Sequence, residues 1–378
     1  MLRRLFAAAV RIGMEMTNQS LEIAVQTSTN HPIFNSTSKL EQVIDKAVAV
    51  VSPDDIALQS MLRPLSKYLA DEEVREIAIP HPNLVFLRMR GAWHERVEPA
   101  LTFGHLKALA AAMGSYNEGI DFAPIMSLKL LNGERGQVVL PPAVIEGTIS
   151  MNIRKHSSVV MSLDELANNG AFDSWRNSKT SGKSTSADRE LLSLLKSGDI
   201  KQFLHRAVLL RKNIIIGGPT GSGKTTFARS LIELVPTSER LITIEDVHEL
   251  YLPRHRNKVH LIYGEGSGQP SASDCVAACM RSSPDRIFLS ELRGAEAWDY
   301  LSALNTGHPG SITTTHANSA RDIYDRVTML IKQSVAGNQM DIGTLRNYLY
   351  ATLDIALYFD KFKLLEVYFD PERTAEFA

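Results

Sequence analysis

The sequence contains few cysteines, almost no net charge and no long apolar run. The two cysteines, Cys275 and Cys279, exclude a disulfide-rich scaffold and favour a reducing compartment. A formal net charge of -1 over 378 residues gives no indication of a nucleic-acid-binding protein, although it allows a local basic patch. No apolar run approaches the roughly 18 residues that a membrane-spanning helix needs. The remaining composition, 44% hydrophobic and 22% charged, is typical of a globular chain of two or three domains.

Residues 1–50 predict an extension of uncertain order. The first stretch, MLRRLFAAAVRIGMEM, has an apolar segment that is too short for a signal peptide and is interrupted by Arg11. As a helix it would gather apolar side chains on one face and place Arg4 with Arg11 on another, which suits a peripheral contact with an anionic membrane surface. The alternative interpretation is a frayed leader, or a start at Met14 or Met16.

The rest of the chain divides into two predicted domains and a linker. Residues 51–175 combine helical patterns with strand-like runs such as VREIAIP, NLVFLRMR and TISMNIRK, which predicts a smaller α+β domain. Residues 176–190 are rich in serine, threonine, lysine and glycine and predict a linker. In residues 191–378 short apolar strands alternate with helices, which is the pattern of an α/β domain whose parallel sheet is covered by helices.

The strongest chemical motif is the stretch GPTGSGKTT, residues 218–226. An apolar strand precedes it and a helix opens at Lys224, which is the context of a phosphate-binding loop. The glycines let backbone N–H groups face phosphates, and the helix N-terminus adds its dipole. Lys224 would supply charge to the β- and γ-phosphates, and the Thr225 hydroxyl would coordinate Mg²⁺. The predicted nucleotide-binding residues here are Gly218, Pro219, Thr220, Gly221, Ser222, Gly223, Lys224, Thr225 and Thr226.

Two carboxylates follow other predicted strands of the same domain. Glu291 comes just after the run RIFLS, and Glu245 ends the run LITIE. Because the carboxyl ends of parallel strands meet at one edge of the sheet, both side chains should lie beside the phosphate loop. Either could hold Mg²⁺ or polarise the attacking water, and the spacing does not decide which is the catalytic base. ATP and Mg²⁺ are therefore the predicted ligand and cofactor, with Thr225, Glu245 and Glu291 as metal-binding residues, direct or through water.

The stretch GHPGSITTTHANSA carries two histidines, His308 and His316, beside three consecutive threonines. A metal site is disfavoured, because the histidines are eight residues apart with no cysteine or further ligand cluster near them. His316 instead follows a third strand, SITTT, at the same sheet edge. There a neutral imidazole can donate to a γ-phosphate oxygen, so we interpret His316 as a phosphate sensor and His308 as structural or interfacial. Cys275 and Cys279, four apart on an apolar helix, are interpreted as core residues.

Four blocks of this sequence resemble those of a known family. GPTGSGKTT, TIEDVHEL, RIFLSELRGAEA and NTGHPGSITTTHANSA look like the Walker A, Asp box, Walker B and His box of secretion ATPases, and are most similar to VirB11-type ATPases of type IV secretion systems. Upstream, GERGQVVLPPAVIEGTISMNIRKHS resembles the end of that family's N-terminal domain. The resemblance implies that Arg135 and Arg154 reach the nucleotide. The one departure is Ser290, where the family usually has glycine.

The resemblance implies a C-terminal RecA-like P-loop ATPase domain with a smaller α+β N-terminal domain. It further implies a homo-hexameric, Mg²⁺-dependent ATPase motor that powers substrate translocation or pilus assembly. The implied location is cytoplasmic, with a peripheral association with the inner membrane. Its implied partners are other secretion-system ATPases and inner-membrane components, with protein or DNA cargo reached indirectly.

Two other functions stay open at this point. The first is a motor of the type II secretion or type IV pilus kind, although many assembly members of that group carry a four-cysteine zinc element that two cysteines cannot form. The second is a nucleotide-gated docking scaffold with little hydrolysis. Glu245 and Glu291 argue against a scaffold, because a protein that only binds nucleotide needs no acid to position water.

Overall fold

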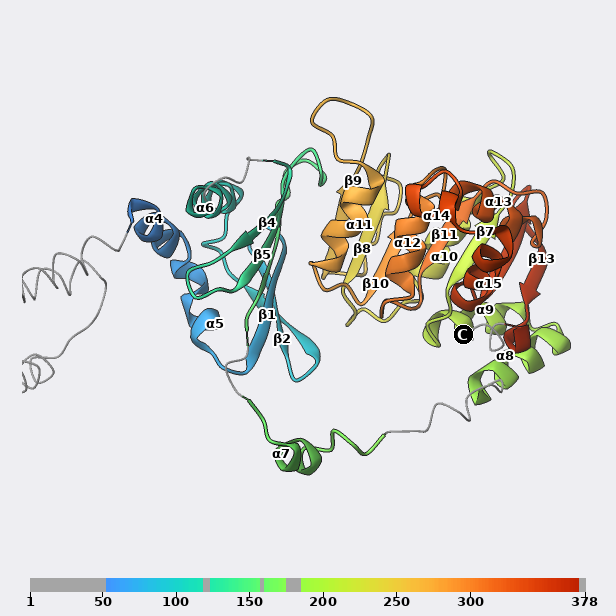
Figure 1. The fold of residues 1–378 in the computed structure, drawn as a ribbon, viewed down its shortest axis with the longest axis horizontal. Helices are drawn as coiled ribbons and strands as arrows, with labels where there is room; N and C mark the ends of the chain where they lie inside the picture. The colour runs from blue at the N-terminus through green and yellow to red at the C-terminus, as the bar shows by residue number, and fades with distance from the viewer. Residues whose placement is uncertain (1–51, 118–122, 157–159, 175–184, 374–378) are drawn as a thin grey trace, which may run out of the picture. The chain divides into compact units, whose positions relative to one another are not determined.

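The computed structural model describes residues 52–117, 123–156, 160–174 and 185–373 (Figure 1). The chain divides into two units between Arg63 and Pro64, and each is described by itself. The predicted extension, residues 1–50, lies outside the described residues. In the described part of the first unit, helix α4 (Pro53–Met61) begins with Ser52 as its N-cap and Pro53 at its start. A short 3-10 helix, Arg63–Leu65, follows at the boundary.

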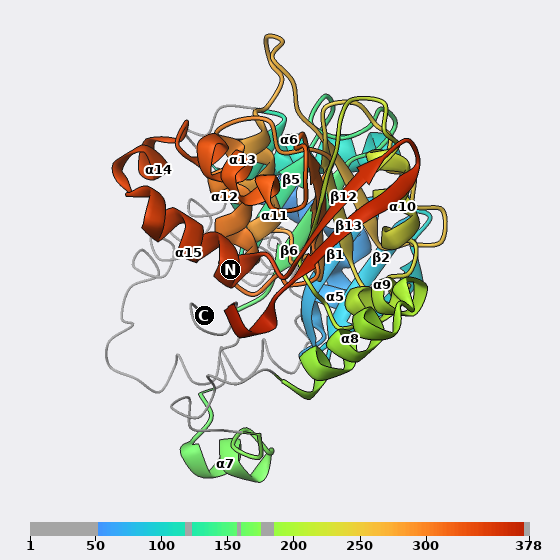
Figure 2. The same ribbon diagram turned by 90° about the vertical axis from the view of Figure 1, so that its right-hand side faces the viewer.

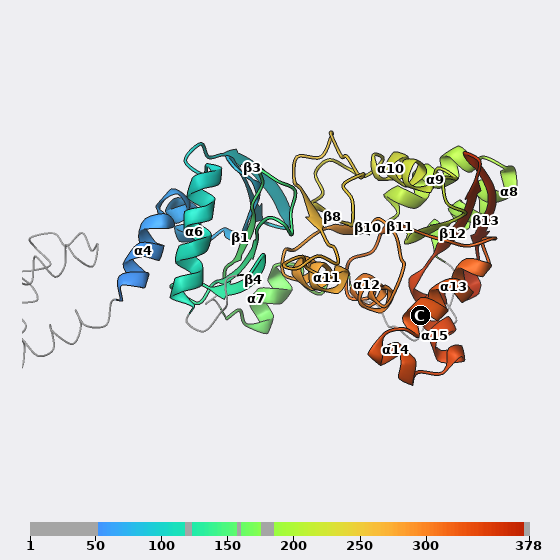
Figure 3. The same cartoon turned by 90° about the horizontal axis from the view of Figure 1, so that it is seen from above.

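The second unit begins with an antiparallel sheet covered by a helix. Its six strands lie in the order β3-β2-β1-β6-β5-β4, and α6 lies along one face of the sheet and buries Leu106, Leu109 and Met113 (Figure 3). This is the predicted α+β arrangement. The elements are α5 (Ser66–Ala70), β1 (Val74–His81), β2 (Leu84–Met89), β3 (Ala92–Val97), α6 (Phe103–Tyr116), β4 (Ile125–Lys129), β5 (Arg135–Val139) and β6 (Ser150–Arg154).

The linker that we predicted at residues 176–190 ends earlier than expected, because a helix begins inside this range. After helix α7 (Leu163–Asn168), residues 175–184 lie outside the described residues. Helix α8 (Ser186–Ser197) then begins inside the range 176–190 that we predicted as linker. The reason is local, because the Thr185 hydroxyl accepts from the Asp188 N–H while the Asp188 carboxylate accepts from the Thr185 N–H. This capping box starts a helix within a polar segment that composition alone assigns to a linker.

The remaining chain forms an α/β arrangement with two groups of strands. One is the parallel sheet β10-β8-β9, and the other has the order β11-β7-β12-β13, with β13 antiparallel. The strands are β7 (Ile214–Gly217), β8 (Leu241–Glu245), β9 (Lys258–Ile262), β10 (Arg286–Leu289), β11 (Ile312–Thr315), β12 (Ile355–Asp360) and β13 (Lys363–Phe369). The helices after α8 are α9 (Ile200–Leu209), α10 (Lys224–Ile232), α11 (Ala272–Met280), α12 (Glu296–Leu304), α13 (Asp322–Ile331), α14 (Val335–Gln339) and α15 (Ile342–Thr352).

Side-chain hydroxyls join the two groups of strands where β10 lies beside β11. The three consecutive threonines of β11 each donate to a backbone carbonyl of β10 or of the residues after it, and the Leu292 N–H donates back to Thr314 O at 2.8 Å. The hydroxyl bonds run from Thr313 to Leu289 O at 2.7 Å, from Thr314 to Ser290 O at 2.8 Å and from Thr315 to Leu292 O at 3.2 Å. The strands therefore continue in the order β9-β8-β10-β11-β7-β12-β13.

Helices cover both faces of these strands (Figure 2). Helices α11, α12, α13 and α15 pack on one face, and α8, α9 and α10 pack on the other. Alternate residues of β7 supply the two cores, since Ile215 belongs to the first and Ile214 and Ile216 to the second. Cys275 and Cys279 are fully buried in the first core, which confirms their interpretation as core residues.

The antiparallel sheet contacts the α/β part through half-buried polar groups around Asp285. Asp285 accepts from the Arg240 N–H at 2.7 Å and from the Trp93 indole at 3.0 Å, and it pairs with Arg88 at 3.4 Å. Arg240 is fully buried beside Trp93, and burial lowers the pKa of this guanidinium to about 10. Across the part of the chain that the structure describes, no helix is long and apolar enough to span a bilayer.

Candidate functional site

The loop between β7 and α10 requires its glycines. A Cβ atom on Gly218 would lie 2.0 Å from the Phe359 carbonyl oxygen, and one on Gly223, at φ +96°, would lie 2.7 Å from the Phe362 ring. Gly221, at φ +74°, adopts a left-handed conformation that other residues rarely take. The Phe362 N–H also donates to Ser222 O at 3.0 Å, so the β12–β13 turn holds the loop in place. Residues 218–223, between β7 and α10, thus have the glycine-dependent backbone that the predicted phosphate-binding loop requires.

Lys224, the first residue of α10, is buried in this loop. Its ammonium donates to Gly218 O at 2.9 Å and to Pro219 O at 2.8 Å. Lys224 as a whole is 7% exposed. Burial lowers the pKa of Lys224, and the negative charge of Glu291 opposes that shift. The lysine and the glutamate are therefore close enough to interact electrostatically.

The other predicted loop residues differ in accessibility. Pro219, Thr220 and Thr226 are exposed, and Thr225 is half-buried. Ser222 is 3% exposed, and its hydroxyl oxygen has no hydrogen-bond partner among the described residues. A buried hydroxyl without a partner is costly, so this group fits a ligand that would supply one.

Glu291 lies beyond β10 among three charged or titratable side chains. Its Oε2 accepts from Arg293 Nε at 2.7 Å, and Arg293 also donates to Asp246. His316 Nε2 lies 2.8 Å from Glu291 Oε1, off the hydrogen-bonding direction, so that buried oxygen has no donor among the described residues. The hydrogen bond that Arg293 donates to Glu291 raises the pKa of Arg293 above its usual value. The structure therefore brings together Lys224, Glu291 and His316, which the sequence predicted as catalytic.

Arg293 and Asp246 were not among the sequence-predicted residues. Both stand inside motifs that the sequence analysis quoted, ELRG and TIEDVHEL. The structure shows how they are connected, because Arg293 forms ion pairs with the carboxylates of both Glu291 and Asp246. The signal for Arg293 was only an arginine two residues after Glu291, and that arginine could equally have faced solvent. The signal for Asp246 was a carboxylate directly after Glu245 at a strand end.

Glu245 lies in a different cluster from Glu291. It is fully buried, and its Oε2 accepts from the N–H groups of Leu250 at 2.7 Å and Glu249 at 2.8 Å. Its Oε1 accepts from the Thr243 hydroxyl at 2.5 Å and has the Nδ1 atoms of two histidines, His248 and His260, at 3.3 Å. Burial raises the pKa of Glu245, but these donors outweigh it and lower the pKa to about 2. Within the described residues its contacts do not include the phosphate loop, so its predicted catalytic role stays a prediction.

Arg135, the first residue of β5, and Arg154, the last residue of β6, are cross-strand partners. Both are exposed, and Arg154 lines a hollow of about 630 Å³. The other residues around it are Arg75, Glu76, Arg88, Gly91, Lys155, His156 and Ser283. Among the contacts of the described residues, none joins either arginine to Gly218–Gly223 or Lys224, so the predicted role of both stays a prediction. His308 lies elsewhere, with Nδ1 3.3 Å from Ala303 O, as a structural residue would.

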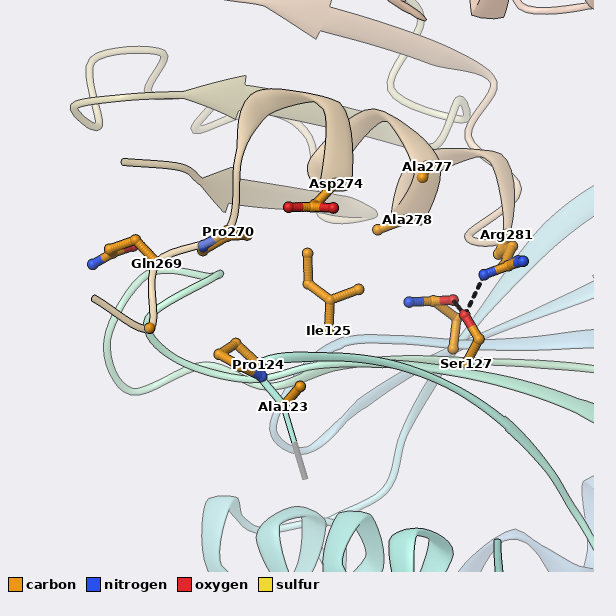
Figure 4. Close-up of a pocket in the computed structure, with 12 residues that line it drawn as sticks. Ala123, Pro124, Ile125, Ser127, Gln269, Pro270, Asp274, Ala277, Ala278 and Arg281 are labelled. Carbon is orange, nitrogen blue, oxygen red and sulfur yellow. Dashed lines mark hydrogen bonds between the residues drawn. The ribbon is translucent and has the colours of Figure 1, made fainter. Parts of the chain in front are cut away.

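A second hollow, of about 440 Å³, separates β4 and β5 from α11 (Figure 4). Ile125 and Pro124 lie across it from Ala277 and Ala278, and Arg281 donates to the Ser127 hydroxyl at 2.6 Å at one end. None of its lining residues belongs to the phosphate loop or to the Glu291 cluster. It is therefore a separate feature of the molecule.

Comparisons with known proteins agree with the motifs. Residues 183–350 match the family described as "Type II/IV secretion system protein". The chain is 37% identical to "Type IV secretion system protein VirB11" of Brucella suis over 82% of this chain and 88% of that protein, and 38% identical to the Bartonella henselae protein of that name over 88% and 96%. It also superposes on the crystal structure of the Brucella suis VirB11 ATPase in complex with sulphate, with a TM-score of 0.79, 37% identity and coverage of 85% and 99%.

Proposed function

This chain belongs to the family of VirB11 ATPases of type IV secretion systems, and from that premise we propose that it hydrolyses ATP in a Mg²⁺-dependent reaction. We further propose that six copies form a ring that powers substrate translocation or pilus assembly. The observation that carries the proposal is the cluster of Lys224, Glu291 and His316 beside a phosphate loop. A protein that only bound nucleotide would not need a buried carboxylate oxygen that is free to accept a proton.

The loop fits a nucleotide triphosphate. Gly218 leaves room where a Cβ would collide, Ser222 offers an unpartnered hydroxyl, and the N-terminus of α10 presents unpaired N–H groups. Thr225, in the first turn of α10, and Glu291 supply the oxygen ligands that Mg²⁺ prefers. When bound, Mg²⁺ would neutralise part of the phosphate charge.

Lys224, Glu291 and His316 would each have a different role in the hydrolysis of ATP. Lys224 would leave the Gly218 and Pro219 carbonyls and pair with the phosphates, which are stronger partners for an ammonium. Glu291 Oε1 would take the proton of the attacking water, while Arg293 holds Oε2 and so fixes the direction of the carboxylate. His316, beside Oε1, would donate to the γ-phosphate and lose that partner after hydrolysis. This assignment makes Glu291 the base and leaves Glu245 as a supporting residue.

Ring assembly supplies what a single chain lacks. Arg135 and Arg154, exposed partners on β5 and β6, carry the charge that would stabilise a phosphoryl group in transfer. We propose that the ring brings them to a nucleotide and that hydrolysis moves N-terminal parts against C-terminal parts. The motor would work in the cytoplasm at the inner membrane, with other secretion ATPases and membrane components as partners and protein or DNA as indirect cargo.

The first test is ATP turnover per chain against protein concentration in the presence of Mg²⁺. Turnover that rises as copies assemble is expected, because the active site is then completed in the ring. The matched control is Glu291→Gln, which keeps the size of the side chain and should bind ATP while losing about 10² to 10⁴-fold in turnover.

Two results would contradict the proposal. Turnover that is independent of concentration, in a chain that stays monomeric, would mean that one chain holds a complete site. Tight ATP binding without turnover would favour the docking scaffold instead.

A further inference from the structure

The turn between β12 and β13 lies beside the phosphate loop. Strand β12 pairs in parallel with β7, and Tyr358 of β12 is opposite Gly217, the last residue of β7. The turn after β12 therefore lies at the same edge of the sheet as the loop after β7. Its contact with the loop is direct, because the Phe362 N–H donates to Ser222 O at 3.0 Å. The Phe362 ring also lies 2.7 Å from the position that a Cβ atom on Gly223 would take.

The turn has a backbone conformation that phenylalanine rarely adopts. Asp360 pairs with Lys363 across it, so the turn has two residues. These are Lys361 and Phe362, at φ +48° and +59°. Glycine, asparagine and aspartate are preferred at such left-handed positions, and a bulky side chain there is strained. Strained positions of this kind cluster at ligand-binding sites, so the conformation of Phe362 points to a function outside the fold itself.

The Phe362 side chain is presented to solvent rather than to the core. The residue is 69% exposed. In contrast Phe359, three residues earlier on β12, is 6% exposed and stacks on Phe227 with the ring centroids 4.5 Å apart. Burying an aromatic side chain is favourable, so an exposed ring that contacts the phosphate loop fits a flat, apolar partner.

The order of the strands sets the direction of a bound nucleotide. Strand β7 lies between β11 and β12, so the loop after β7 has His316 on the β11 side and the β12–β13 turn on the other side. In the proposed function the γ-phosphate lies at Glu291 and His316. The base is at the opposite end of the nucleotide from the γ-phosphate, which directs it toward the turn that carries Phe362.

The chemistry of the ring suits a nucleobase. Every base has a π-face, and stacking on an aromatic side chain contributes to binding without requiring a particular base. We propose that Phe362 is a nucleotide-binding residue whose ring stacks on the base of the bound nucleotide. This inference rests on the proposed ATPase function, and it adds a residue that distinguishes a nucleoside triphosphate from inorganic triphosphate.

The test measures the affinity of the full-length chain for a nonhydrolysable ATP analogue with Mg²⁺ by calorimetry. Phe362→Ala should weaken binding by about tenfold, equivalent to about 1.4 kcal/mol, because it removes the ring. Phe362→Leu keeps an apolar side chain against Gly223 but has no π-face, so it should show a similar loss. Phe362→Tyr keeps the ring and should bind like the unchanged protein. The matched control is Leu365→Ala, which alters an exposed apolar residue of the same hairpin and should also bind like the unchanged protein.

Two further measurements separate the base from the phosphates. In Phe362→Ala the KM for ATP should rise by about tenfold while kcat changes by less than about twofold, because stacking contributes equally before and during the reaction. Inorganic tripolyphosphate, which has no base, should bind Phe362→Ala and the unchanged protein equally.

Three results would overturn the inference and leave the proposed ATPase function standing. They are equal affinity of Phe362→Ala and the unchanged protein for the ATP analogue, full affinity in Phe362→Leu, and equal losses for the analogue and for tripolyphosphate. The last would mean that the ring holds the loop and not the base. Analogue binding without ATP turnover in the unchanged protein would contradict the proposed hydrolysis but not the stacking. No binding of the analogue by the unchanged protein would overturn both.

Discussion

At the scale of single residues, the two predicted acids have opposite surroundings. Glu291 keeps one buried oxygen without a donor, whereas donors surround both oxygens of Glu245. A carboxylate without a donor on one oxygen can accept a proton, but one saturated with donors is stabilised as an anion. Both acids were predicted at strand ends, and the sequence could not tell which one is the catalytic base. The backbone N–H groups that hold Glu245 belong to the loop after β8, whose conformation the sequence did not predict.

The lowered pKa of Glu245 predicts a pH-dependent contribution to stability. Its pKa is about 2 in the folded chain against an ordinary value of 4.5. Because the folded pKa is the lower one, the stabilisation is present above pH 4.5 and is lost as the pH falls toward 2, amounting to about 3 kcal/mol. Glu245→Gln should therefore lower the free energy of unfolding at pH 7, and the difference from the unchanged protein should shrink on acidification.

Urea unfolding of both proteins at pH 7, 5, 4 and 3 measures this difference. Glu249→Gln, which alters an exposed carboxylate in the same loop, is the control and should have little effect. A constant difference from pH 7 to pH 3 would show that the charge of Glu245 does not stabilise the fold.

At the scale of elements, the hydroxyl bonds between β10 and β11 replace backbone pairing. The Thr313 hydroxyl donates to Leu289 O at 2.7 Å, and the residue is 2% exposed. Thr313→Val keeps the shape but leaves a buried carbonyl without this donor, so it should destabilise the chain by about 1–3 kcal/mol. Thermal or urea unfolding measures the change.

The matched control is Thr328→Val in α13. Thr328 is equally buried, and its hydroxyl donates to Tyr324 O at 2.7 Å, four residues earlier in the same helix. That carbonyl keeps a helical N–H partner, so the control should cost less. Equal losses in the two variants would mean that the hydroxyls do not join the strands.

Much of this architecture could be predicted from local patterns. The strand, glycines and helix of the phosphate loop follow directly from the sequence, because each residue type is required by its backbone conformation. The threonines of β11 were less predictable. They stood beside two histidines and suggested site chemistry, but the contact that explains them lies between strands more than twenty residues apart. The contact between Glu245 and His260 depended in the same way on the pairing of β8 with β9.

At the scale of the whole molecule, the proposed ring predicts that two inactive variants should restore each other's ATP turnover when they are mixed. Lys224→Ala removes the phosphate-binding charge, and the double variant Arg135→Ala with Arg154→Ala removes the arginines from the other part of the chain. Each should be inactive in turnover alone. The arginine variant should fold because both arginines are exposed, and circular dichroism checks the fold of Lys224→Ala. If the arginines act on the nucleotide of a neighbouring copy, mixing the two chains creates sites with an intact lysine and intact arginines.

Random mixing in equal amounts should then restore about a quarter of the unchanged turnover, because half of the sites keep the lysine and half of those face a neighbour with its arginines. The measurement is ATP turnover after the two proteins are dissociated and reassembled together, with each protein treated alone as the control. No recovery, in mixtures that demonstrably form mixed assemblies, would mean that the arginines act within their own chain. Recovery would instead make the assembled ring, and not the single chain, the unit that completes the site.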